Sequence, residues 1–164
     1  VGMDISESAI KLCRSSHEID GLEFVVGDSE SIPSEKETFD AVLNVESSHC
    51  YGNPTAFLSE VQRVLKPEGF LLWCDFRSQN EMKRFFKLAD DVGLTLINQT
   101  DITKNILDAL DLLTPGRKKQ IDIHVPKIIR NVFKSYAGLR GSSVHNAFLA
   151  GELVYKSAMF QKES

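Results

Sequence analysis

The sequence has no long hydrophobic run, no excess of positive charge and few cysteines, and each absence excludes a class of protein. Its longest apolar runs fall well short of the roughly 20 residues needed to cross a bilayer, so no membrane span is predicted. A formal net charge of −4 offers no basic surface to a phosphate backbone, which argues against a nucleic-acid partner. The first residues, VGMDIS, contain neither a basic region nor an apolar signal segment.

Cysteine and histidine are too sparse and too scattered to predict a metal site. The cysteines are odd in number, widely spaced and not in CxxC pairs; they are Cys13, Cys50 and Cys74. This pattern argues against a disulfide framework and against a structural zinc site. Of the four histidines, His17, His124 and His145 also lack metal-ligand spacing. We therefore expect no metal, and a reducing, cytoplasmic compartment.

What is present indicates a single α/β domain over residues 1–164. Hydrophobic residues make up 42% of the chain and charged residues 26%, as in globular proteins. Ser6 and the pair Asn53-Pro54 are typical of helix starts. Helical segments alternate with short, nearly continuous apolar runs, which predict a parallel sheet with helices on both faces. The predicted strands span residues 1–5, 22–26, 39–45, 70–76 and 94–98.

The pattern changes after Asp101, where a helical insertion is predicted before a last strand. Apolar residues at helical spacing form two groups, within 106–110 and 125–136, and the helix breakers Pro115-Gly116 lie between them. Residues 138–151 are rich in Gly and Ser, which is typical of a loop. We place the insertion at residues 101–145 and the last strand at 152–161.

Polar residues follow four of the predicted strands, and ligands bind at the carboxyl ends of strands in open α/β sheets. These positions are Asp4, Asp28, the segment 44–51 and Asp75. An acidic residue after the second strand of a nucleotide-binding sheet accepts hydrogen bonds from ribose hydroxyls, and Asp4 fits that position. Its alternative role is a helix-start carboxylate, and the alternative for Asp28 is a turn-forming residue.

Four motifs in order and spacing resemble the class I S-adenosylmethionine-dependent methyltransferases, in particular their small-molecule branch that methylates sugars, polyketides and lipids. They are MDIS, FVVGDSESIP, FDAVLNVESSHCY and EVQRVLKPEGFLLWCDF. The stretch RVLKPEGFLL is similar to the family's LKPGG connection, with Glu68 in place of the first glycine. The resemblance covers residues 1 to about 100. It implies a Rossmann-like sheet, S-adenosylmethionine as cofactor, and a substrate lid at residues 101–145.

The resemblance also implies which positions contact the cofactor. In the family, the acidic residue after the second strand holds the ribose, and the Asp of the GD turn lies at the adenine. The segment after the fourth strand runs beside the methionine moiety. The matching residues are Asp4, Ile5, Asp28, Ser29, Asn44, Val45 and Glu46.

A catalytic pair follows from the same resemblance. In similar O-methyltransferases a His after the fourth strand works with an Asp after the fifth, which matches His49 and Asp75, 26 residues apart. An imidazole can remove the proton of an acceptor hydroxyl, and a carboxylate can orient it and stabilise its cation. The alternatives are a strand-end histidine bonded to the backbone and a carboxylate that caps a turn.

The family's first strand and glycine-rich cofactor loop have no counterpart before Val1. We therefore expect an amino-terminally incomplete domain with two unpaired strand edges, inactive by itself. The predicted function is methyl transfer to a hydroxyl group of a small or lipid-like acceptor, with His49 as general base. Two rivals stay open: a non-catalytic binding or assembly module, and an NAD-dependent oxidoreductase, although no Tyr-x-x-x-Lys motif occurs. Self-association is also left open.

Overall fold

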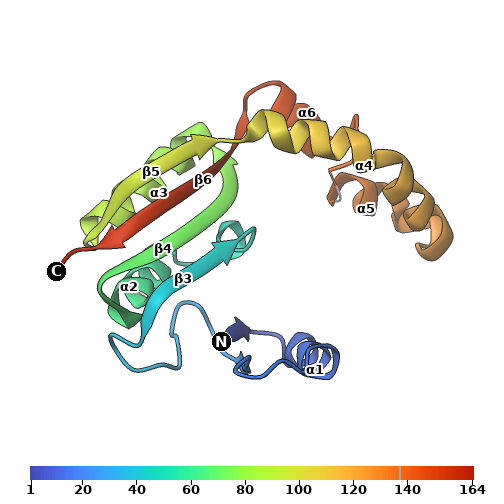
Figure 1. The fold of residues 1–164 in the computed structure, drawn as a ribbon. Coiled ribbons are helices and arrows are strands. Elements are labelled where there is room, and N and C mark those ends of the chain that lie inside the picture. Colours follow the sequence, from blue (N-terminus) through green and yellow to red (C-terminus); the bar gives the residue numbers. More distant parts are fainter. Residues whose placement is uncertain (137) are drawn as a thin grey trace.

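A four-stranded mixed sheet forms the centre of the computed structural model, which describes residues 1–136 and 138–164 (Figure 1). The strands lie in the order β3 (Phe39–Val45), β4 (Leu65–Ser78), β6 (Leu153–Lys162), β5 (Leu94–Asp101). Strand β3 is parallel to β4, whereas β6 is antiparallel to both of its neighbours. The prediction of an α/β sheet packed with helices is confirmed. Two details differ: the last strand runs antiparallel to its neighbours, and the helices that build the core lie on one face of this sheet rather than on both.

The direction of β6 follows from where the insertion leaves and rejoins the sheet. The backbone N–H of Ile102 donates to the carbonyl of Tyr155 at 2.9 Å. The N–H of Tyr155 donates to the hydroxyl of Thr103 at 2.8 Å. The chain thus returns at the sheet end that it left, and a strand that starts there must run antiparallel to β5. An alternation of strands and helices does not reveal this.

Strands β1 (Gly2–Asp4) and β2 (Phe24–Val26) form a separate parallel pair that helix α1 (Glu7–Ser16) contacts. A cleft of about 570 Å³ separates this pair from β3, and its walls include Gly2, Met3, Ala41 and Leu43. Among the described residues, no strand pairs with the edge of β1 or of β3 that borders this cleft. The two unpaired strand edges expected from the sequence are therefore present.

Helices α2 (Pro54–Val64) and α3 (Gln79–Asp91) cover one face of the four-stranded sheet and build the core with it. The Asn53 side chain caps α2 by accepting from the N–H of Ala56 at 3.1 Å. Ser78 and Glu81 form a capping box at the start of α3. The core unites helix and strand residues, among them Leu58, Val61, Leu71, Trp73, Phe85 and Phe160.

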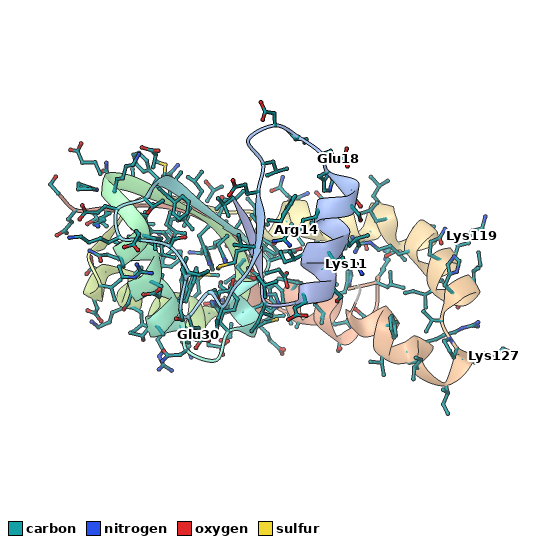
Figure 2. All side chains as sticks on the ribbon, turned by 90° about the horizontal axis from the view of Figure 1, so that it is seen from below. Lys11, Arg14, Glu18, Glu30, Lys119 and Lys127 are labelled. Carbon is teal, nitrogen blue, oxygen red and sulfur yellow. The ribbon has the colours of Figure 1, made fainter. Side chains whose placement is uncertain are left out.

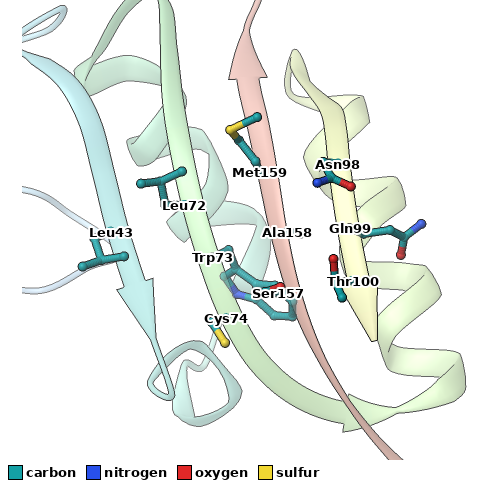
Figure 3. A pocket seen from close by; sticks show the side chains of 10 residues that line it. All are labelled: Leu43, Leu72, Trp73, Cys74, Asn98, Gln99, Thr100, Ser157, Ala158 and Met159. Atoms are coloured by element: carbon teal, nitrogen blue, oxygen red, sulfur yellow. The ribbon is translucent and has the colours of Figure 1, made fainter. Parts of the chain in front are cut away.

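The opposite face of this sheet carries a shallow depression of about 300 Å³ (Figure 3). All the residues that line it come from the four strands, including Leu72, Cys74, Gln99 and Met159. Because side chains alternate along a strand, Leu71 and Trp73 point into the core while Leu72 lies on this open face and is 39% exposed.

The insertion is helical, as predicted, and leads away from the sheet (Figure 1). It contains α4 (Thr103–His124), η2 (Lys127–Ile129), α5 (Arg130–Tyr136) and α6 (Ser143–Leu149). The predicted break at Pro115-Gly116 is wrong, because α4 runs through both residues. The helix ends instead at Val125, whose backbone is extended, as the residue before a proline prefers.

The loop predicted at residues 138–151 is also wrong in its second half, where α6 forms. The Ser142 hydroxyl caps this helix by accepting from the N–H of His145 at 3.3 Å. Both its buried side chains fix the helix: Nε2 of His145 lies 3.0 Å from a carboxylate oxygen of Asp111 in α4, and the Phe148 ring packs against the rings of Phe76 and Tyr155 in the sheet. A short helix held by two buried side chains gives too weak a periodic signal in a Gly- and Ser-rich stretch.

Candidate active site

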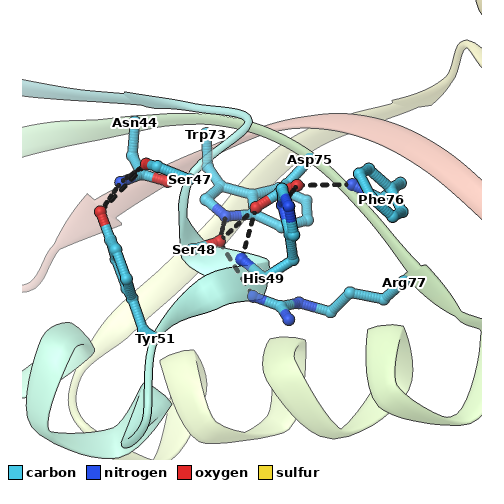
Figure 4. A network of polar contacts seen from close by, with 9 residues as sticks. All are labelled: Asn44, Ser47, Ser48, His49, Tyr51, Trp73, Asp75, Phe76 and Arg77. Atoms are coloured by element: carbon cyan, nitrogen blue, oxygen red, sulfur yellow. Dashed lines mark hydrogen bonds and ion pairs between the residues drawn. The ribbon is translucent and has the colours of Figure 1, made fainter. Parts of the chain in front are cut away.

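The segment after β3 turns sharply and places a short helix, η1 (Ser48–Cys50), beside strand β4. The last strand bond runs from the N–H of Glu46 to the carbonyl of Cys74 at 2.9 Å. Glu46 then adopts a left-handed backbone with φ of 51°, which redirects the chain. This turn brings the Ser48 hydroxyl and the His49 imidazole against the side chain of Asp75 (Figure 4).

Asp75 is fully buried and accepts hydrogen bonds at both carboxylate oxygens. Oδ2 accepts from the Ser48 hydroxyl at 2.7 Å and from the backbone N–H of His49 at 2.9 Å. Oδ1 accepts from the N–H of Phe76 at 2.9 Å and lies 2.7 Å from Nδ1 of His49. The structure thus brings together the two residues that the sequence singled out as a pair.

The geometry defines the state of the His49 ring. An ionised carboxylate can only accept, so the contact with Asp75 assigns the proton to Nδ1 and leaves Nε2 as an acceptor. The His49 side chain is 28% exposed, and its ring lies 4.4 Å from that of Phe76. A histidine held at one nitrogen and accessible at the other is suited to take up a proton.

Ser48 is the centre of the network, and the sequence did not identify it. Its hydroxyl donates to Asp75 and accepts from Nε1 of Trp73 at 2.8 Å and from Nη2 of Arg77 at 2.9 Å. These three bonds use the full capacity of a hydroxyl group. Ser48 is 1% exposed, so no water can replace them. The only sequence signal was its position directly before His49.

Arg77 brings a positive charge to the same buried region. Burial lowers the pKa of its guanidinium group, and the nearby carboxylates of Asp75 and Glu81 oppose that shift. The guanidinium lies over the Phe85 ring at 4.7 Å, a favourable cation–π arrangement. Its Nε is buried and has no hydrogen-bond partner within the described chain.

A second small network borders the cleft between β1 and β3. The Asn44 amide donates to the Ser47 hydroxyl and to the Tyr51 hydroxyl, both at 3.0 Å. Asn44 is 7% exposed, and its carbonyl oxygen Oδ1 is buried with no partner among the described residues. A buried acceptor without a donor is energetically unfavourable, and it is available to a donor group of a ligand.

The predicted cofactor positions divide into two groups. Four of them line the cleft: Asp4, Ser29, Asn44 and Val45. Three do not: Ile5, Asp28 and Glu46. Ile5 is 73% exposed.

Two of the carboxylates also have the local roles that the sequence left as alternatives. Oδ1 of Asp4 accepts from the N–H of Ser6 at 2.7 Å, at the start of α1. Oδ1 of Asp28 accepts from the N–H of Glu30 at 2.9 Å, within a turn. In each case the second carboxylate oxygen remains for another partner.

Tyr155 and Cys74 lie close to Glu46 and are held in their neutral forms. Burial raises the pKa of the Tyr155 hydroxyl, and a hydrogen bond and the charge of Glu46 raise it further. Burial also raises the pKa of the Cys74 thiol. A thiol of this kind is a poor nucleophile.

Neither a metal centre nor a membrane span is found in the part of the chain that the structure describes. No group of three or more His, Cys, Asp or Glu side chains within residues 1–136 and 138–164 could hold a metal ion. No helix among these residues has the length and apolar character needed to cross a bilayer.

Residues 1–73 match the family described as "Methyltransferase domain". The phthiotriol/phenolphthiotriol dimycocerosates methyltransferase of Mycobacterium tuberculosis is 35% identical over 162 residues, which cover 99% of this chain and 60% of that protein. This chain is a homologue of these methyltransferases. It spans about 60% of the length of the first curated relatives it matches.

Further relatives agree with this assignment. The fatty-acid O-methyltransferase of Mycolicibacterium smegmatis is 34% identical over 139 residues, 85% of this chain and 51% of that protein. Among solved structures, a putative sarcosine dimethylglycine methyltransferase from Galdieria sulphuraria superimposes with a TM-score of 0.82 at 16% identity, over 98% of this chain and 68% of that one.

An O-methyltransferase of a polyketide synthase from Brevibacillus brevis, in complex with S-adenosyl-L-homocysteine, gives a TM-score of 0.76 at 17% identity. The match covers 99% of this chain and 58% of that one. At these identities the structures show a common fold, the Rossmann-like methyltransferase fold.

Proposed function

We propose that this chain is part of an S-adenosylmethionine-dependent methyltransferase that acts on a small or lipid-like acceptor at a hydroxyl group, with His49 as general base. The observation that carries the proposal is the 2.7 Å contact between His49 Nδ1 and the buried carboxylate of Asp75. It lies directly after β3, next to the cleft that we assign to the cofactor.

The cleft has features that suit the cofactor. Asp4 has one carboxylate oxygen left for a ribose hydroxyl, and Asn44 Oδ1 is a buried acceptor without a donor. Val45 and Ser29 also line the cleft. We propose three further cofactor contacts at residues that do not line it: Ile5, Asp28 and Glu46. When bound, S-adenosylmethionine supplies a sulfonium methyl, a strong electrophile. The protein then has to align the acceptor and remove its proton.

His49 performs the proton step in this proposal. Its Nε2 takes the proton from the acceptor hydroxyl, and Asp75 stabilises the imidazolium that forms. Ser48, Trp73 and Arg77 hold the carboxylate in place through the Ser48 hydroxyl, so the imidazole does not have to reorient. Positioning of this kind is a large part of catalysis when the electrophile is already reactive.

We further propose that residues 101–145 form a lid over the acceptor. Support comes from their position. The insertion leaves the sheet at Ile102, which bonds Tyr155 where the chain has returned to the sheet, and the Tyr155 hydroxyl lies close to Glu46. The named substrates of two relatives, phthiotriol dimycocerosates and a fatty acid, favour a lipid-like acceptor. Packing of these helices within the fold is the simpler role for their apolar residues.

A non-catalytic binding or assembly module is the second candidate. The free edges of β1 and β3 favour it, because unpaired strand edges are ready places for another strand to bind. No observation on the described residues favours the NAD-dependent oxidoreductase.

Calorimetric titration with S-adenosylhomocysteine tests the cofactor assignment on this chain and on the longest native form of the protein. Binding by the native form supports a methyltransferase, and its absence there overturns the proposal. If the native form binds S-adenosylhomocysteine and the present chain does not, some of the cofactor contacts lie outside the present chain.

Turnover of the longest native form of the protein with a panel of long-chain alcohols tests the base, because an alcohol, unlike an ionised fatty acid, still carries the proton that has to be removed. His49→Ala is expected to lower kcat by about 100- to 10,000-fold, the range typical of a positioned acid or base. His17→Ala, at an exposed histidine far from the site, is the control and should keep its rate. An unchanged rate in His49→Ala removes His49 from the mechanism.

A further inference from the structure

The outer end of the insertion, residues 117–133, has an unusual charge for this chain. It contains five of the 19 basic residues of the whole sequence but only one of the 23 acidic residues. Its formal net charge is therefore +4, whereas the rest of the chain carries −8. The basic residues are Arg117, Lys118, Lys119, Lys127 and Arg130. We call residues 117–133 the tip surface.

The tip surface also exposes apolar side chains. Ile128 is 92% exposed, Val132 67% and Ile123 60%. Ile128 and Val132 are four residues apart across η2 and α5, so they lie on one side of this helical stretch. Figure 2 shows Lys119 and Lys127 at the outer end of the insertion, with their side chains pointing away from the molecule.

Local hydrogen bonds hold the tip surface in shape. The guanidinium group of Arg130 donates to the carbonyl of Val125 at 2.8 Å and to that of Asp122. These bonds connect the end of α4 to the start of α5 across the turn at Val125-Pro126. The exposed isoleucines are thus presented on a defined turn.

Single exposed apolar residues are common, but their combination with a local positive charge restricts what can bind them. Nucleic acid would use the lysines and gain nothing from the isoleucines. A second copy of the tip surface would bring two charges of +4 together, which opposes association. An anionic lipid surface satisfies both features, because headgroups attract the lysines and the acyl boundary accepts the apolar side chains.

We propose that the tip surface docks on an anionic lipid surface. Ile128 and Val132 enter the boundary between headgroups and acyl chains, and Lys118, Lys119 and Lys127 lie at the level of the headgroups. The contact gives the chain a site for lipid that is separate from the His49–Asp75 pair and does not depend on methyl transfer.

Flotation with vesicles of phosphatidylcholine, with and without phosphatidylglycerol, tests the charge contribution. The chain is expected to bind the vesicles that contain phosphatidylglycerol, and added salt should weaken the binding. The triple variant K118Q/K119Q/K127Q should bind about a hundredfold more weakly, at about fivefold per lysine. The control triple K11Q/K36Q/K83Q removes the same charge at exposed positions elsewhere and should bind like the wild type.

The apolar contribution is tested with I128S/V132S at constant charge. Each substitution should weaken binding about tenfold. The control I19S/L12S changes two side chains that are 62% and 65% exposed on the other side of the chain, and it should have no effect. Because all these positions are exposed, thermal unfolding should show that every variant folds like the wild type.

Three outcomes overturn the proposal: no binding to vesicles that contain phosphatidylglycerol, equal losses in the control variants, or a tip variant that changes the oligomeric mass in light scattering. The last result would make the tip surface a contact between copies. Calorimetry with S-adenosylhomocysteine needs no vesicles, so failure here and failure of the methyltransferase proposal are separate results.

Discussion

Ser48→Ala should destabilise the chain far more than the loss of one surface hydroxyl. The substitution removes the acceptor of Trp73 Nε1 and of Arg77 Nη2, and one donor to Asp75. Trp73 is 2% exposed, so its N–H finds no water, which costs about 1–3 kcal/mol. Asp75 keeps three of its donors, and the lost bond to this charged group adds about 1–2 kcal/mol. We expect the free energy of unfolding to fall by about 2–5 kcal/mol.

Urea unfolding followed by tryptophan fluorescence measures this directly, because Trp73 is the chain's only tryptophan and lies in the network. The adjacent Ser47→Ala is the matched control. Ser47 bonds Asn44 and Tyr51, but these two also bond each other at 3.0 Å, so each keeps a partner. The control should lose less than about 1 kcal/mol.

The reasoning would be refuted if the two variants had equal free energies of unfolding, or if Ser48→Ala lay within about 0.5 kcal/mol of the wild type. Either result would mean that the Trp73 N–H and the Asp75 carboxylate find other partners. The Ser48 hydroxyl would then not be what holds Asp75 against His49.

Three further results are expected. Leu71→Ala, at a fully buried core position, should lower the free energy of unfolding by about 2–5 kcal/mol, whereas Leu72→Ala on the open face should cost less than about 1 kcal/mol. The hydrogen bond from Arg63 holds the pKa of Glu60 below its ordinary value, so its stabilisation is complete above that value and is lost as the pH falls through the lowered pKa. Glu60→Gln should therefore be less stable than the wild type at neutral pH, and the difference should vanish in acid; a constant difference in melting temperature would contradict this. Pro115→Ala should raise the melting temperature and the helical circular dichroism signal, because Pro115 lies inside α4 and lacks a helix N–H; an unchanged melting temperature would show that the helix already accommodates it.

The sequence predicted the elements with a strong local signal. Asn53 and Pro54 start α2 as expected, and β3 spans the predicted residues 39–45. The resemblance to O-methyltransferases, rather than a spacing rule, suggested the pair His49 and Asp75, which lie 2.7 Å apart. Features that depend on contacts between residues far apart in the chain were harder to predict.

The network of Ser48, Trp73 and Arg77 shows why long-range contacts are hard to predict from the sequence. Their bonds join residues 25 to 29 positions apart, from a short helix and one strand, and no spacing rule identifies them. The antiparallel direction of β6 likewise depends on the contact between Ile102 and Tyr155, which local patterns do not encode. The helix through Pro115 is a case where a local breaker signal did not decide the structure.

The paired bonds that join Ile102 and Thr103 to Tyr155 have a consequence for how this fold can diversify. Everything between them leaves and re-enters the sheet through one point, so its length does not affect the register of β5 and β6. An insertion attached in this way can be replaced by another segment as a unit, while the contact between His49 and Asp75 stays unchanged. The length and the surface of the insertion can therefore vary without a change in the sheet or in the hydrogen bonds to Asp75.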